Sequence, residues 1–363
     1  MDRRSLLKGA GLGAATLAGT TIAAPALAQG KRELKLVTTW PKNFPGLGFS
    51  PERVAERVTA MTEGQLTIKV FAAGELVPAF ESFDAVSTGG ADMYHGAEYY
   101  WQGKSKAYPF FTAVPFGLTA VEMISWIYHQ GGQELWDQLA ANFNIKPFAC
   151  GNTGVQMGGW FNKEINTIDD YRGLKIRMPG LGGEVLRKLG ATAVALSGGE
   201  IFPALQSGNI DATEWVGPWN DLAFGFYKIA KFYYYPGFHE PGAQLALGVN
   251  LDVWNSLTKP QQIMIEDACR AENNYNLAEF EAQNTGALRR LLDEHGVQLK
   301  RQSDDILQEI GRVSGEVLRE AAATDDITKQ VFDSFLAART NSMEWGLISE
   351  DAYKSARRLP FEF

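Results

Sequence analysis

Short apolar strands alternate with amphipathic helices along much of this chain of 363 residues, and this alternation is the feature that most limits its fold. Residues 34–40 have the composition of a strand, and Val54, Val58 and Met61 then recur at helical spacing. Residues 66–70 alternate between apolar and polar side chains, as a second strand does. Strands separated by helices at this spacing predict βαβ units, a largely parallel sheet and an α/β fold class.

The same pattern starts again in the middle of the chain. A helix that begins at Pro78 leads through glycines to Asp92, and a helix that begins at Pro203 leads through a glycine to Asp211. Each aspartate leads into a short predicted strand. We interpret this weak repeat as two lobes of similar design whose strand ends face each other.

These signals predict the domain organisation. Lobe 1 is expected over residues 29–150, with a return crossing near 245–255 that would help to form a hinge, and lobe 2 over 151–244. A polar helix over 258–295 is about three times the mean length of a globular helix, so we expect it to span both lobes. Residues 303–363 are expected to be helical. The apolar tail of this region has two interpretations, a dimerisation surface or docking onto the body of its own chain.

The first 28 residues are predicted to be a signal peptide. Arg3 and Arg4 precede a weakly apolar, glycine-rich run, and small residues around Ala28 match a cleavage site. The arginine pair indicates a twin-arginine signal, although Leu6 stands where such signals often carry phenylalanine. The run is too short and too rich in glycine for a good membrane span. We therefore expect a soluble periplasmic protein, exported by a twin-arginine or Sec-type signal.

Composition and motifs exclude several classes of protein. The formal net charge of −8, with no Lys/Arg run in the body of the chain, argues against a nucleic-acid partner. The four histidines lack H-E-x-x-H spacing, which argues against a transition-metal site, and no nucleophile elbow or Walker loop is present. Cys150 and Cys269 lie in apolar runs; two buried free thiols are favoured, and a disulfide stays open.

Arg177 is the first candidate functional residue. It ends a predicted strand, and Pro179 and Gly180 then stop that strand. A guanidinium fixed at a strand end presents a planar fork of donors that matches one carboxylate. The alternative is an arginine paired with a neighbouring acid.

Gln156, Glu214 and Glu240 are candidate oxygen donors, because they lie among aromatic and glycine residues rather than on a charged face. A glutamate is costly to bury unless it is paired or bound to a cation. Two interpretations stay open: an Arg177–Glu214 salt bridge, or a hard cation that shares a small carboxylate ligand with Arg177. Amide, carboxylate and carbonyl oxygens suit sodium or calcium. The few carboxylates and the lack of a D-x-D-x-D loop favour sodium.

Four segments together resemble a known family. They are Gly-Val-Gln156, Lys-Ile-Arg-Met-Pro179, Pro-Ala-Leu-Gln-Ser-Gly-Asn-Ile-Asp211 and Glu214-Trp215. These segments are similar to the periplasmic solute-binding subunits of TRAP transporters, in the branch that binds 2-oxo acids such as pyruvate together with a cation. The resemblance covers nearly the whole chain after the signal peptide. It implies a type II-like, two-lobed periplasmic binding protein with a long strapping helix and a C-terminal helical segment.

The resemblance also implies roles for individual residues. Arg177 would clamp the substrate carboxylate, and Gln156 would contact both substrate and cation. Glu214 and the carbonyl of Trp215 would hold the cation, and Glu240 would lie near both substrate and cation. The other lobe would contribute His95, Gly96, Ala97 and Tyr100. The resemblance further implies membrane permease subunits as partners, a homodimer through the C-terminal helix, and Na⁺ or Ca²⁺ bound with the ligand, without an organic cofactor.

The favoured function is therefore a binding protein, not an enzyme, that captures a small monocarboxylate and delivers it to a permease. Pyruvate, a branched 2-oxo acid and a 2-hydroxy acid such as lactate all fit one arginine and an apolar surround. The alternative is a periplasmic, cation-assisted enzyme that acts on small carboxylic acids with Glu240 or His239 as its base. A purely structural envelope protein would leave the buried polar set without a purpose.

Overall fold

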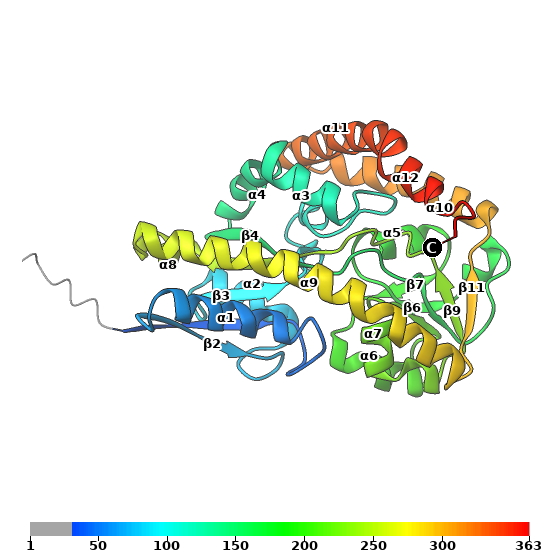
Figure 1. Cartoon of the computed structure of the whole chain (residues 1–363), viewed down its shortest axis with the longest axis horizontal. Coiled ribbons are helices and arrows are strands. Elements are labelled where there is room, and N and C mark those ends of the chain that lie inside the picture. The colour runs from blue at the N-terminus through cyan, green and yellow to red at the C-terminus, as the bar shows by residue number, and fades with distance from the viewer. Residues whose placement is uncertain (1–30, 363) are drawn as a thin grey trace, which may run out of the picture. The chain divides into compact units, whose positions relative to one another are not determined.

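Two mixed β-sheets organise the part of the chain that the computed structural model describes, residues 31–362 (Figure 1). The predicted signal peptide, residues 1–28, lies outside these residues. The first sheet has the strand order β2-β1-β3-β10-β4 and the second has the order β11-β9-β5-β8-β6-β7. The predicted α/β fold class is confirmed. The predicted lobe boundaries remain predictions.

The strands of the first sheet are β1 (Arg32–Thr38), β2 (Leu66–Phe71), β3 (Met93–Gly96), β4 (Ile145–Asn152) and β10 (Gln244–Asn250). The strands of the second sheet are β5 (Gly159–Phe161), β6 (Lys175–Arg177), β7 (Thr192–Val194), β8 (Ala212–Thr213), β9 (Phe232–Tyr235) and β11 (Gln298–Arg301). The first part of the chain carries helices α1 (Phe49–Met61), α2 (Ser82–Ser87), α3 (Ala120–His129) and α4 (Gly132–Ala141), with 3₁₀ turns η1 (Ala79–Glu81), η2 (Glu98–Trp101) and η3 (Tyr108–Phe111). The middle part carries α5 (Gly180–Lys188), α6 (Gly198–Gln206) and α7 (Pro218–Phe224), with η4 (Ile168–Tyr171) and η5 (Phe226–Lys228).

The expectation of a largely parallel sheet was wrong, because both sheets are mixed. β1 is parallel to β2 and β3, but β10 runs antiparallel to both β3 and β4. In the second sheet, β5 runs antiparallel to β8 and β9. β5 and β10 are the strands at which the chain passes from one sheet to the other. A parallel connection needs a crossover, usually a helix, between neighbouring strands of one sheet. β5 and β10 lack such a connection to their neighbours, and each runs antiparallel to the strands beside it.

The helix expected to begin at Pro203 begins earlier. α6 begins at Gly198, where Ser197 and Glu200 form a capping box, and Pro203 lies inside the helix. The capping box satisfies the first backbone N–H groups, so the helix starts there and tolerates the proline further along. At the other site of the repeat, Pro78 precedes the 3₁₀ turn η1. The two halves of the repeat therefore differ in how their helices start.

One long helix passes both sheets. α8 (Leu251–Ser256) precedes α9 (Lys259–Asp293), which begins at a capping box formed by Thr258 and Gln261. Asn273 of α9 accepts a hydrogen bond from the backbone N–H of Gly151, beside the first sheet, at 3.1 Å. Asn284 accepts one from the N–H of Trp219 in α7, beside the second sheet, at 3.1 Å. The predicted strapping helix is thus confirmed (Figure 1).

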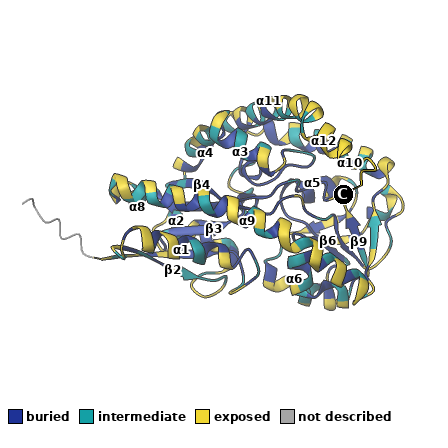
Figure 2. Cartoon of the chain, viewed as in Figure 1, coloured by how far each residue is buried: buried dark blue, intermediate teal, exposed yellow. Residues whose placement is uncertain are grey.

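The C-terminal helices are α10 (Asp304–Ala322), α11 (Asp326–Ile348) and α12 (Glu350–Ala356). α10 packs on α5, whereas α11 packs on α3 and α4, so the pair forms a second connection across the molecule. The ribbon of Figure 2 is coloured as exposed along much of α11 and α12, whereas the strands are coloured largely as buried. Within residues 31–362, none of the helices combines the length and apolarity that a bilayer crossing requires. The two cysteines, Cys150 and Cys269, are buried and free, as favoured from the sequence.

A buried carboxyl group anchors η2, the turn that carries Tyr99 and Tyr100. Glu98 is fully buried, and its Oε1 accepts hydrogen bonds from the Tyr94 hydroxyl at 2.8 Å and from the Trp136 indole at 3.2 Å. Burial raises the pKa of Glu98 to about 8, although both hydrogen bonds act to lower it.

We therefore expect Glu98 to make stability depend on pH. Its folded-state pKa lies above its usual value of 4.5, so between these pH values the folded chain binds the proton more tightly. The free energy of unfolding should fall as pH rises from about 4.5 to about 8, by a maximum of roughly 5 kcal/mol from this group. Glu98→Gln mimics the neutral acid and should lose this dependence in urea unfolding at pH 5, 7 and 9. Glu134→Gln, at an exposed site on α4, is the control, and equal pH slopes for the two variants would contradict the prediction.

Candidate functional site

Arg177, the last residue of β6, lies at the centre of a buried polar cluster. Its side chain is fully buried, and Nε donates to the carbonyl of Leu196 at 3.2 Å. Nη1 donates to the carboxylate of Glu214 and Nη2 to the hydroxyl of Tyr100, the latter at 3.3 Å. The chain turns sharply just afterwards. Gly180 has a φ of +64°, and a Cβ there would lie 3.2 Å from Tyr99, so glycine is needed for the turn that brings Tyr99 close.

The Arg177–Glu214 ion pair, one of the two interpretations that the sequence left open, is present and fully buried. Burial lowers the pKa of Arg177, but the Glu214 carboxylate raises it, and the result is above the usual value. The guanidinium therefore stays charged. The pair uses Oε1 of Glu214. The other oxygen, Oε2, lies 3.4 Å from Nε2 of His239 and has no hydrogen-bond partner in the described part of the chain.

Gln156 and Glu240 form the second pair in the cluster. Nε2 of Gln156 donates to Oε2 of Glu240 at 2.8 Å and to the hydroxyl of Thr153 at 3.0 Å. The backbone N–H of Gln156 donates to the carbonyl of Glu240 at 3.1 Å, which fixes the two loops together. Burial raises the pKa of Glu240 well above its usual value, and Glu214 raises it further, while Arg177 lowers it.

Several buried polar atoms of this cluster lack partners. Across residues 31–362, nothing hydrogen-bonds to Oε1 of Gln156, Oε2 of Glu214 or either ring nitrogen of His239. A buried polar atom without a partner costs about 1–3 kcal/mol. Ligand atoms of Glu214, His239 and Glu240 all lie within 4.8 Å of one another. The donor set therefore fits a cation, because the ion would satisfy atoms that the protein leaves unsatisfied.

Aromatic side chains from both sides enclose a small cavity beside this cluster. The cavity has a volume of about 10 Å³, which is room for one water molecule. It is lined by Trp40, Leu47, Tyr99, Tyr100, Thr153, Gln156, Trp215, Val216, Glu240, Ala243 and Leu245. The Trp215 ring lies 5.0 Å from the Arg177 guanidinium carbon, within the range of a cation–π contact. A small organic acid would enter only if some of these groups moved apart.

Direct contacts close the cavity. They join residues that follow strands of the first sheet to residues of the second sheet and its helix α7. Asn220 in α7 donates to the carbonyl of Pro45 at 3.1 Å, and the rings of Phe44 and Phe224 lie 4.3 Å apart. The Tyr100–Arg177 hydrogen bond is a third such link. The Trp215 ring also contacts Trp40 at 6.1 Å and Phe44 at 6.2 Å, so aromatic contacts and hydrogen bonds together hold the site shut.

The structure brings together six of the residues expected in the site. Tyr100, Gln156, Trp215 and Glu240 line the cavity. Arg177 contacts Tyr100 and Trp215, and Glu214 pairs with Arg177. Three others, His95, Gly96 and Ala97, lie beside this cavity but are not among its lining residues. His95 accepts from the Trp40 indole at 2.8 Å through Nδ1 and donates to the Cys150 carbonyl at 2.8 Å through Nε2. Gly96 packs against Thr39 and Trp101, and Ala97 lies in an apolar cluster, so neither lines the cavity.

Sequence reasoning missed seven of the lining residues: Trp40, Leu47, Tyr99, Thr153, Val216, Ala243 and Leu245. Trp40 follows β1, so the rule that ligands meet the carboxyl ends of strands would have found it. Thr153 lies in the glycine-rich run after β4, three residues before Gln156. Tyr99 is next to Tyr100 and carried no separate signal.

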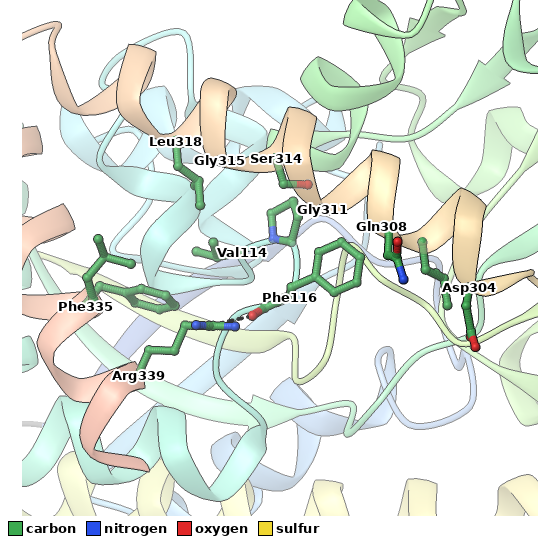
Figure 3. A pocket seen from close by; sticks show the side chains of 13 residues that line it. Val114, Phe116, Asp304, Gln308, Gly311, Ser314, Gly315, Leu318, Phe335 and Arg339 are labelled. Atoms are coloured by element: carbon green, nitrogen blue, oxygen red, sulfur yellow. Dashed lines mark hydrogen bonds between the residues drawn. The ribbon is translucent and has the colours of Figure 1, made fainter. Parts of the chain in front are cut away.

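A second hollow lies away from the polar cluster, between α10, α11 and residues 114–116 (Figure 3). Its volume is about 560 Å³, and its apolar lining includes Val114, Phe116, Leu318 and Phe335. Arg339 of α11 donates to the carbonyl of Phe116 at 2.7 Å at its edge. We call this hollow the C-terminal groove.

Solved TRAP periplasmic solute-binding proteins share this fold of two sheets joined by crossing strands. The chain belongs to the DctP family, the bacterial extracellular solute-binding proteins of family 7, whose sequence profile matches residues 36–325. The resemblance to TRAP solute-binding subunits is thereby confirmed.

Similar proteins support this family and its fold. The monocarboxylate 2-oxoacid-binding periplasmic protein of Nostoc sp. (strain PCC 7120) is 44% identical over 321 residues, 88% of each chain. A TRAP solute-binding protein of Pseudoalteromonas atlantica, solved with sodium and pyruvate, is 38% identical and covers 92% of this chain and 100% of its own, with a TM-score of 0.88. A Bordetella bronchiseptica protein, solved as a mixed-occupancy dimer with calcium and picolinate, is 34% identical and covers 90% and 97%, with a TM-score of 0.88.

Proposed function

We propose that this protein captures a small monocarboxylate, a 2-oxo acid such as pyruvate, together with Na⁺ or Ca²⁺, and delivers it to the permease subunits of a TRAP transporter. The observation that carries the proposal is the fully buried Arg177, surrounded by oxygen atoms that have no partner among residues 31–362. The relatives that bind pyruvate or picolinate with sodium or calcium support it.

The carboxylate of the ligand would bind the guanidinium of Arg177. Nη2 makes only a long bond, 3.3 Å, to the Tyr100 hydroxyl, so a charged acceptor would compete well for it. Trp40, Trp215 and Leu245 offer apolar surface to the rest of the ligand. The small cavity favours a three-carbon acid such as pyruvate or lactate over a branched 2-oxo acid, which would require wider opening.

The cation would bind the oxygens that this pairing leaves free. Glu214 divides its two oxygens, with Oε1 on Arg177 and Oε2 available. Gln156 does the same, because Nε2 is bound to Glu240 while Oε1 is available. We propose that these two atoms, with the Trp215 carbonyl and Glu240, hold the ion. Amide, carboxylate and carbonyl oxygens suit Na⁺ or Ca²⁺.

Arg177→Ala should abolish pyruvate binding, and Arg177→Lys should weaken it by about a hundredfold or more, because an ammonium group cannot replace the two-pronged fork. Isothermal titration calorimetry in sodium buffer measures both. Arg187→Lys, at an exposed arginine on α5, is the matched control and should bind normally.

Normal affinity in Arg177→Lys would remove the role given to this residue. Because we propose a binding protein without chemistry, NMR of the same samples should show the acid unaltered after incubation. A new product would instead favour the alternative enzyme, with Glu240 or His239 as its base.

Removal of cations should weaken pyruvate binding. Dialysis against chelator in sodium-free buffer leaves Oε2 of Glu214 uncompensated, so we expect a loss of affinity of about tenfold or more. Added Na⁺ or Ca²⁺ should restore it in the wild type but not in Glu214→Gln. If affinity does not change on dialysis, Glu214 serves only as the structural partner of Arg177.

We also propose that the protein acts in the periplasm after export by the signal peptide predicted over residues 1–28, and that it forms a homodimer through its C-terminal helices. The buried stripe of α11 ends at Ala338. Beyond it, Trp345, Leu347 and Ile348 are each about two-thirds exposed or more. A second copy would cover these side chains, and the C-terminal groove offers apolar surface for them (Figure 3).

The paired substitution Leu347→Asp with Ile348→Asp should convert the dimer to a monomer, since burying each of these side chains contributes about 1.5–3 kcal/mol. Analytical ultracentrifugation over a range of concentrations measures the change. Ile263→Asp, at an exposed isoleucine on α9, is the control and should remain dimeric. A wild-type protein that stays monomeric throughout would show that these residues do not join two copies.

A further inference from the structure

His239 is a buried residue whose contacts do not explain its side chain. It lies in the loop between β9 and β10 and is 2% exposed. Within residues 31–362, neither Nδ1 nor Nε2 has a hydrogen-bond partner. An imidazole with two unsatisfied nitrogens is costly in a protein interior, so the residue needs a partner that binds there.

The surrounding chain makes room for this imidazole. A Cβ at Gly182, in the first turn of α5, would lie 2.7 Å from the Cβ of His239. Glycine at this position therefore lets the loop approach the turn that follows Arg177. The Phe238 ring lies 5.5 Å from the imidazole. His239 is thus built into the cluster.

Oε2 of Glu214, which likewise has no hydrogen-bond partner among residues 31–362, lies close to His239. Nε2 of His239 lies 3.4 Å from Oε2 of Glu214. In a tetrahedral zinc site, bonds of about 2.1 Å place neighbouring ligand atoms about 3.4 Å apart. Glu240 supplies a third ligand atom within the same 4.8 Å. Two atoms already have the separation that a shared metal ion requires.

The chemical type of the ligand atoms decides which metal ion the site prefers. Oxygen ligands alone suit sodium and calcium, whereas an imidazole nitrogen suits zinc and similar ions. We propose that His239 is a nitrogen ligand in the cation site, so that Glu214, His239 and Glu240 also bind a divalent transition ion such as Zn²⁺ or Co²⁺. This inference rests on the proposed cation site and adds a ligand and a class of metal to it.

Co²⁺ provides the test, because its visible spectrum and its hyperfine-shifted NMR signals report on the ligands. Untagged wild-type protein should bind one Co²⁺ per chain, give d–d bands, and show an exchangeable, strongly shifted N–H proton from a bound imidazole. Residues that merely orient a ligand change metal affinity by about 10–100-fold, so His239→Gln, which removes the ligand itself, should weaken Co²⁺ binding at least tenfold. The shifted N–H signal should disappear in this variant. Zn²⁺ should displace Co²⁺ from the wild type.

His129→Gln, at an exposed histidine on α3, is the matched control and should keep both the affinity and the shifted signal. If His239→Gln fails to fold, the wild-type spectrum still decides, because lack of a shifted imidazole N–H on Co²⁺ binding overturns the inference. An unchanged Co²⁺ affinity and spectrum in a folded His239→Gln overturns it equally. Calorimetry with Ca²⁺ separates the two proposals: if Ca²⁺ supports pyruvate binding but Co²⁺ gives no imidazole signal, this inference alone fails. If no cation binds or supports pyruvate binding, the proposed cation site fails.

Discussion

The burial of one guanidinium group is the constraint on which the rest of the site depends. A buried arginine cannot lose its charge, so the fold must supply an anion and further acceptors beside it. Glu214 supplies the anion, and the carbonyl groups of Leu196 and Glu214 accept the remaining bonds on that side. A buried ion pair seldom adds much stability, because the cost of removing two charges from water offsets their attraction. The pair instead fixes the position of the Arg177 guanidinium, the group proposed to bind the ligand carboxylate.

The polar groups around Arg177 are likewise only partly used by contacts within the protein. Glu214 and Gln156 each use one polar atom within the protein, while the other has no hydrogen-bond partner in the described part of the chain. Each side chain can therefore be positioned and still bind a ligand or an ion. Asp221 supports these groups indirectly. Its carboxylate accepts hydrogen bonds from the Tyr233 hydroxyl and the Trp160 indole. Oδ1 of Asp221 lies 3.3 Å from the backbone N–H of Val216 and accepts from it, which fixes the loop after Glu214 and Trp215. Burial raises the pKa of Asp221 to about 7, although these three donors lower it.

Much of the fold was predictable because its signals are local. Capping boxes at Thr119 and Thr258 mark two helix starts. Arg177 could be assigned to a strand end from the apolar alternation before it and from Pro179 and Gly180 after it. The direction of a strand has no such local signal. The antiparallel direction of β5 and β10 follows from the passage of the chain between the two sheets. The histidines show the same limit. His95, expected near the ligand, hydrogen-bonds to Trp40, which lines the cavity, and to the carbonyl of Cys150. His239, dismissed as a metal ligand for its spacing, lies beside Glu214, which is distant in sequence.

The two halves of the molecule meet through the groups that would bind the ligand. In the closed arrangement Tyr100 reaches Arg177 across the cavity, so a hydroxyl from one half satisfies a charge on the other. A carboxylate that takes the place of this hydroxyl would replace a neutral hydrogen bond by a charge-assisted one, which is about twice as strong. The bound ligand would then replace the direct Tyr100–Arg177 hydrogen bond with a stronger connection that passes through the ligand. Closure and capture would thus depend on the same atoms.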